Sequence, residues 1–147
     1  MAVKGLTLSL LMLAAASGLS ACSNPEREAG GTDFHTLAQE EVSAPQYLPG
    51  DLPIPAGAGI TYTEGEVVGG KKSAMLIYET EESMALLGNT YSQYVKDKEL
   101  EQGTQIIDED NLIINGKVAG DYSYSIIGSS SAEKPGGAEI IVTWVEN

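Results

Sequence analysis

The segment ITYTEGEVVGGKKSAMLIYETEESMALLGNTYSQYVKDK, residues 60–98, decides the fold of this chain. It opens with two runs rich in β-forming residues, 60–68 and 73–78, which are separated by Gly69-Gly70-Lys71-Lys72. A glycine pair tolerates the positive φ angles of a tight turn. We therefore expect the two runs to form an antiparallel hairpin.

The rest of the segment predicts one main helix, over about residues 81–98. Its apolar residues recur at spacings of three and four, the pattern of a helix with one buried face. Thr80 is expected to cap the helix through its hydroxyl, and Gly103 is expected to end it. The apolar stripe consists of Met84, Leu87, Tyr91, Tyr94 and Val95.

After the helix the pattern returns to strands. Short turns join antiparallel neighbours, so we expect an α+β, two-layer domain with the helix packed on a mostly antiparallel sheet of about five or six strands. The last strand has apolar residues on both faces, which predicts a central position covered on both sides. The expected strands are 104–107, 112–114, 122–127 and 138–145, with turns at Asp108-Glu109-Asp110, Asn115-Gly116 and Pro135-Gly136-Gly137.

The single domain is expected to occupy residues 46–147, a length that suits one hydrophobic core. It begins with a proline-rich run, residues 45–55, that disfavours helix. Residues 22–45 are polar and acidic, and we expect them to form a flexible tether with one or two helical turns near residues 36–42.

Residues 1–21 predict a signal peptide, because one positive charge, Lys4, precedes an apolar run that ends in small residues. The run of about fourteen residues reaches only about 21 Å as a helix, at about 1.5 Å per residue. A hydrocarbon core of about 30 Å needs a longer segment. We expect a cleaved leader rather than a lasting transmembrane helix.

The leader ends in Leu19-Ser20-Ala21-Cys22, and Cys22 is the only cysteine. These four residues resemble the lipobox of bacterial lipoproteins at every position. The resemblance implies cleavage before Cys22, whose sulfur then carries a thioether-linked diacylglycerol and whose amino group carries a fatty acyl chain such as palmitate. With Ser23 rather than Asp in the next position, it also implies the inner leaflet of the outer membrane, facing the periplasm. The alternative is a plain secretory signal cut nearby, which would leave a free thiol.

The domain itself, residues 46–147, resembles small domains of periplasmic lipoproteins that open with Leu-Pro-Ile-Pro, here residues 52–55. Its helix-over-sheet order is also similar to domains of an accessory lipoprotein of the outer-membrane protein assembly machine. Neither resemblance carries over a site residue.

The chain is strongly acidic, with 21 acidic and eight basic residues and a formal net charge of −13. Cleavage before Cys22 would remove Lys4 and no acid. Such a charge repels nucleic acid phosphates and anionic lipid head groups. We expect no nucleic acid partner and no cofactor, and we expect membrane attachment through the acyl chains on Cys22 rather than through a basic patch.

The motifs tested for catalysis are incomplete. Residues 65–71 match seven positions of a phosphate-binding loop, but Lys72 stands where Ser or Thr is needed, and a strand follows instead of a helix. Ser131 and Lys134 have Ser-x-x-Lys spacing, but Pro135 opposes the helix that the motif needs. The sole histidine, His35, falls in the expected tether, where no scaffold positions it for catalysis.

Metal and aromatic candidates are equally weak. The cluster 108–111 could hold calcium through oxygen atoms, yet it lacks the glycine and distal glutamate of the calcium-binding loop, which favours an acidic turn. A zinc site would have to be nearly all carboxylate. Tyr122 and Tyr124 share one strand face and are expected in the core, with an exposed groove as the alternative.

Two functions follow from these observations. The first is a non-enzymatic binding or accessory module for another envelope protein or a small ligand, which would use a sheet face or edge. The alternative is an envelope hydrolase or transferase that uses carboxylates such as Asp51, Asp108 or Asp121. That alternative needs two acids that converge in a cleft with separated pKa values.

Overall fold

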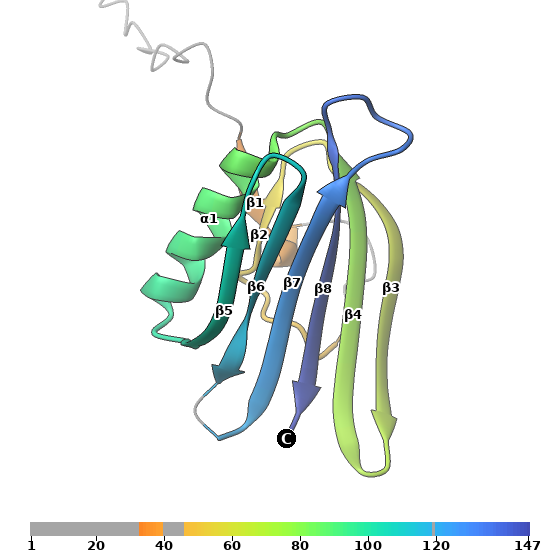
Figure 1. The fold of residues 1–147 in the computed structure, drawn as a ribbon. Helices are drawn as coiled ribbons and strands as arrows, with labels where there is room; N and C mark the ends of the chain where they lie inside the picture. Colours follow the sequence, from red (N-terminus) through yellow and green to blue (C-terminus); the bar gives the residue numbers. More distant parts are fainter. Residues whose placement is uncertain (1–32, 40–45, 119) are drawn as a thin grey trace, which may run out of the picture. The chain divides into compact units, whose positions relative to one another are not determined.

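The computed structural model describes residues 33–39, 46–118 and 120–147. They form an α+β domain with a six-stranded antiparallel sheet of order β3-β4-β8-β7-β6-β5, one α-helix and a two-stranded sheet (Figure 1). This confirms the expected fold class. The strands of the large sheet are β3 (Gly59–Val68), β4 (Lys71–Thr80), β5 (Glu101–Ile107), β6 (Asn111–Val118), β7 (Tyr122–Ser130) and β8 (Ala138–Glu146).

The small sheet corrects the expected tether. Strand β1 (Phe34–Thr36) pairs antiparallel with β2 (Pro53–Pro55), and the 3-10 helix η1 (Leu37–Gln39) follows β1. Leu37 is 1% exposed, and its N–H donates to the carbonyl of Leu52 at 2.8 Å. Residues 34–39 therefore belong to the domain, because they find partners far along the chain. The remainder of the expected tether, 22–32 and 40–45, lies outside the described residues.

The helix α1 (Met84–Asp97) starts three residues later than expected. Its N-cap is Ser83, whose hydroxyl accepts the N–H of Leu86 at 3.3 Å. The expectation that Thr80 caps the helix is therefore wrong. Thr80 ends β4, and its hydroxyl accepts the N–H of Glu82 at 3.2 Å, in the turn that leads into the helix.

The helix also ends earlier than the Gly103 signal indicated. Glu99 takes a left-handed conformation, with φ 54°, and the N–H of Leu100 donates back to Val95 at 3.0 Å. This is the usual way for a helix to close its last turn, although glycine is the commoner residue there. Gly103 lies in β5 instead.

One face of the large sheet packs against α1, and this covered face forms the core. The apolar stripe of the helix supplies the other half of the core, as its spacing predicted. Tyr124 stacks on Trp144 with ring centroids 5.4 Å apart, which confirms the core interpretation of that tyrosine. The buried apolar side chains of the four inner strands are Ala74, Leu76, Tyr78, Leu112, Ile114, Tyr124, Ile126, Ala138, Ile140, Val142 and Trp144.

The expected hairpin is confirmed, with Gly69 and Gly70 at φ 59° and 81° in its turn. The expected turn at Asn115-Gly116 is wrong, because both residues lie inside β6. The chain reverses farther on, where Gly120 has φ 83° and the N–H of Asp121 donates to Val118 at 2.7 Å. Asn115 and Gly116 instead lie against an irregular part of β5 and make room for it.

That irregularity lies between Gln102 and Gln105 of β5, where the register with β6 shifts. The side-chain oxygen of Asn115 accepts the N–H of Thr104 at 2.9 Å, which satisfies a donor that the shift displaces. Gly116 lies against the backbone of Glu101, where no side chain fits.

Candidate functional site

The face of the large sheet opposite α1 is the candidate site, and we call it the open face. Residues paired across antiparallel strands point to the same face of the sheet. The register therefore tells, for each paired residue, whether its side chain lies on the face toward α1 or on the open face. Figure 1 shows α1 and the small sheet beside and behind the strands, with no described element in front of them. Strand β8 is central, as expected, but of its two apolar faces only one is buried: Val142 is fully buried, whereas Val145 is 42% exposed.

Six large apolar side chains, one from each strand, form a row across the open face. The register joins them in order through five strand pairs. Neighbouring strands lie about 4.8 Å apart, so the row is about 24 Å long. We call this set the isoleucine row: Tyr62, Ile77, Ile141, Ile127, Ile113 and Ile106.

The isoleucine row is accessible to solvent. Tyr62, Ile127 and Ile106 are 43%, 42% and 45% exposed, and the other three side chains are half-buried by their neighbours on the same face. Within the described part of the chain, no helix or strand packs on them. A contiguous apolar strip on an exposed face is a candidate interaction surface.

Carboxylates flank the row on both sides. On one side Glu79 of β4 stands directly opposite Glu139 of β8. On the other side Glu64 follows Tyr62 by two residues along β3, and its carboxylate accepts the Tyr62 hydroxyl at 2.8 Å. The polar side chains would remain solvated around a covered apolar centre, as in the core and rim of a protein interface.

A sequence signal for this face exists, although the expectations above did not use it. The chain contains four Ile-Ile doublets, and each falls in a different strand. One member of each doublet points to the core and the other to the open face. The doublets are Ile106-Ile107, Ile113-Ile114, Ile126-Ile127 and Ile140-Ile141.

Two shallow hollows beside α1 are the other candidates. The larger, of about 790 Å³, lies between the helix and β5 and is lined mainly by amide and hydroxyl side chains such as Asn89, Ser92 and Gln105. Gln105 donates to the Ser92 hydroxyl at 2.7 Å, so two of these groups already satisfy each other. The smaller hollow, of about 570 Å³, includes Asp51 and Asp97.

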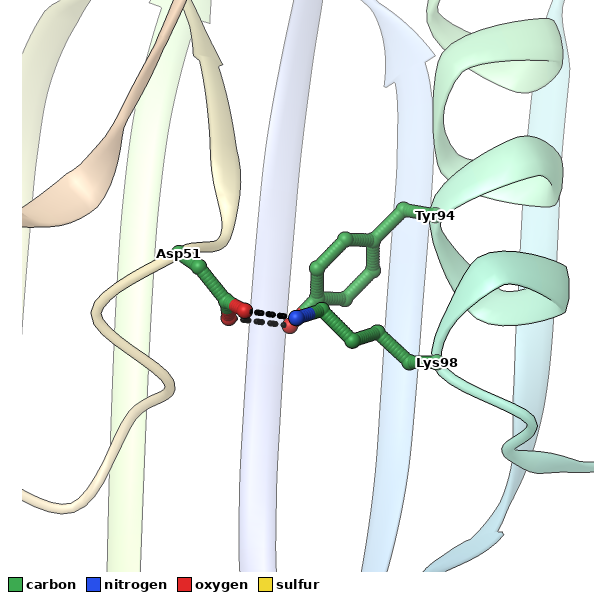
Figure 2. A network of polar contacts seen from close by, with 3 residues as sticks. All are labelled: Asp51, Tyr94 and Lys98. Atoms are coloured by element: carbon green, nitrogen blue, oxygen red, sulfur yellow. Dashed lines mark hydrogen bonds and ion pairs between the residues drawn. The ribbon is translucent and has the colours of Figure 1, made fainter.

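Asp51 serves as a structural tie. Its carboxylate forms an ion pair with Lys98 and accepts the Tyr94 hydroxyl at 3.0 Å (Figure 2). The hydrogen bond from Lys98 holds the pKa of Asp51 below its ordinary value, and burial raises the pKa of Tyr94. The tie fixes the segment before β2 to the end of the helix, with Asp51 ionised and Tyr94 protonated at neutral pH.

The other two carboxylates of the hydrolase alternative lie at opposite ends of β6. Asp108 precedes that strand and accepts the backbone N–H groups of Asp110 and Asn111 at 2.9 and 2.8 Å. The first of these bonds lowers its pKa most. Asp121 follows the strand, in the turn to β7. A general acid at neutral pH needs a raised pKa, and both Asp51 and Asp108 have lowered ones.

The Ser-x-x-Lys segment forms a turn between β7 and β8. The Ser131 hydroxyl accepts the N–H groups of Glu133 and Lys134 at 3.2 and 3.0 Å, so it stabilises the loop. His35 lies in β1 opposite Ile54, rather than in a tether. Among the described residues, no three His, Cys, Asp or Glu side chains gather as a metal site requires.

The lipobox and its cysteine, Leu19, Ser20, Ala21 and Cys22, lie outside the described residues. In the part of the chain that the structure describes, no helix has the length and apolar character to cross a membrane. Comparisons with protein-family models, curated proteins and solved structures found no match.

Proposed function

We propose that this chain is a lipid-anchored, non-enzymatic binding module of the cell envelope, and that its open face docks another envelope protein. The observation that carries the docking part is the isoleucine row, an exposed apolar strip that crosses all six strands. The lipobox ending in Cys22 supports the location.

A protein suits this surface better than a small ligand. Small molecules bind in concave pockets that enclose most of their surface. The open face of a sheet is broad, and its apolar strip runs for about 24 Å. Its apolar centre and polar margins match the anatomy of a protein interface.

The anchor is tested by metabolic labelling with a palmitate analogue. We expect the wild-type chain to incorporate the label and to sediment with membranes. The Cys22→Ala variant should lose the label and leave the membrane fraction. A wild-type chain that carries an unmodified thiol would contradict the anchoring part of the proposal, and it would leave the open face to be tested separately.

The docking surface is tested by photo-crosslinking in whole cells. A photoreactive amino acid replaces Ile127, in the centre of the row. As the matched control it replaces Gln93, which is exposed on the helix side of the domain. We expect a reproducible partner protein at Ile127 and not at Gln93. No partner at Ile127, or the same set of partners at both positions, would refute the docking proposal.

A further inference from the structure

We infer that the partner of the open face presents an apolar ridge flanked by Lys or Arg side chains at one end. This inference rests on the proposed function and adds the chemistry and orientation of the partner. It comes from how the charges are distributed around the isoleucine row.

Three of the four carboxylates that lie two residues from the row surround one half of it. The fourth, Asp108, follows Ile106 at the other end, and its carboxylate already accepts the N–H groups of Asp110 and Asn111. Glu79 and Glu139 lie beside Ile77 and Ile141, on β4 and β8, and Glu64 lies beside Tyr62 on the edge strand β3. Each is two residues along its strand from the row, a distance of about 7 Å. Along β7 and β6 the equivalent neighbours are uncharged: Ser125, Ser129, Asn111 and Asn115.

The lysines on the strands of the open face are farther from the row. Lys71 stands at the hairpin end of β4, six residues from Ile77, and Lys117 is four residues from Ile113 on β6. At about 3.4 Å per residue these separations are about 20 and 14 Å. One lysine lies nearer: the ammonium of Lys134, from the β7–β8 turn, stands 4.0 Å from the place that a β-carbon on Gly59 would take, and Gly59 is paired with Glu79. Around the Tyr62 end, the row is therefore bordered by three carboxylates, Glu64, Glu79 and Glu139, against this single ammonium.

Glu79 and Glu139 form a like-charge pair that the single nearby ammonium of Lys134 compensates only in part. They stand directly opposite each other in adjacent strands, an arrangement that destabilises a sheet. In the described residues neither carboxylate has an ion-pair partner, and the nearest polar contact is the Ser131 hydroxyl, 3.5 Å from Glu79. A cation placed between them by a partner would remove the repulsion and gain two attractions.

The same charges argue against two other occupants. A second copy of the chain would bring its own net charge of −13 and an identical acidic border to the interface. An anionic membrane surface would be repelled for the same reason. Complementary charge favours a cationic partner and suppresses the others.

The test combines the photo-crosslink at Ile127 with charge neutralisation. Glu79→Gln together with Glu139→Gln removes two charges beside the row. Glu109→Gln together with Asp110→Asn removes two charges from the β5–β6 turn, at the Ile106 end of the row, and is the matched control. We expect the first pair to lower the yield of cross-linked partner about tenfold and the control pair to leave it unchanged.

Zero-length carbodiimide coupling supplies a second readout, since it joins a carboxylate to an amine in contact with it. We expect coupling of Glu79 or Glu139 to a partner lysine, lost in the first pair of substitutions. An undiminished photo-crosslink in that pair would overturn the cationic partner while the docking proposal stands. No photo-crosslink in the wild-type chain would overturn both.

Discussion

The carbonyl oxygen of Glu101 lies so close to Gly116 that a β-carbon on Gly116 would approach it to 1.7 Å. The same oxygen accepts a hydrogen bond from the hydroxyl of Tyr124 at 3.0 Å, so a core side chain fixes its position. Two edge-region strands thus approach each other at a point where only a glycine fits.

Gly116→Ala is expected to destabilise the domain by about 2 kcal/mol, because the backbone of β5 would have to move away. Gly59→Ala is the matched control, since a β-carbon at Gly59 meets nothing closer than 4.0 Å. Urea unfolding followed by tryptophan fluorescence measures both. Equal stability of the two variants would contradict the close contact.

Tyr91→Phe is expected to cost about 1–3 kcal/mol. The Tyr91 hydroxyl is buried, donates to the carbonyl of Pro53 at 2.9 Å and lies 2.5 Å from the hydroxyl of Tyr78. Its removal leaves two buried polar groups short of a partner. Tyr62→Phe removes a hydroxyl that is exposed on the open face and should change stability by less than about 0.5 kcal/mol. Denaturant midpoints compare the two.

Ser83→Ala is expected to destabilise the domain by about 1 kcal/mol, because the first turn of α1 loses its cap. Ser83→Asp should keep most of the stability, since a carboxylate also accepts the N–H of Leu86 and favours the positive end of the helix dipole. Thermal unfolding by circular dichroism distinguishes the two variants. A neutral Ser83→Ala would mean that the hydroxyl does not cap.

The assignment of faces is tested by neighbouring isoleucines of β7. Ile126 is fully buried, whereas Ile127 is 42% exposed on the open face. Ile126→Ala should cost about 2–5 kcal/mol through the cavity it leaves, and Ile127→Ala less than about 1 kcal/mol. Urea unfolding of the two variants measures the difference. Similar losses would indicate that something covers both faces.

The pKa of Asp51 lies below 3.8 because of its bond to Lys98. A lowered folded-state pKa means that the contribution of Asp51 to stability is present above pH 3.8 and is lost as the pH falls through the folded-state value. The pair is solvent-exposed, so the contribution is below about 1 kcal/mol. An NMR titration should show the pKa of Asp51 moving up in Lys98→Met. An unchanged titration would exclude Lys98 as the cause.

The helix was predictable because its core-facing residues obey a local rule. Met84, Leu87, Tyr91 and Val95 repeat with the helical period, and the structure buries all four. Its ends were not predictable from residue preferences alone. Ser83 displaces Thr80 as the cap because β4 continues through Thr80, and the extent of that strand depends on its pairing with β8.

Local sequence patterns did not predict which distant segments of the chain pair with each other. Leu37 looks like an isolated apolar residue in a polar stretch, and only its contact with the segment before β2 makes it part of the core. Asn115-Gly116 has the composition of a hairpin turn, but its partner is the bulge in β5. The isoleucine row likewise depends on the register between strands, and the sequence of one strand does not determine that register.

Register shifts in the large sheet occur only where its outermost strands pair with their neighbours, between Ile60 and Tyr62 on β3 and between Gln102 and Gln105 on β5. The inner pairs run without interruption. An outermost strand with an irregular register is a poor template for a further strand, and Glu64 and Glu66 add charge to one of the two outermost strands. Copies of this domain at high local concentration should therefore resist joining edge to edge through backbone hydrogen bonds. Contacts with another protein are then made by side chains.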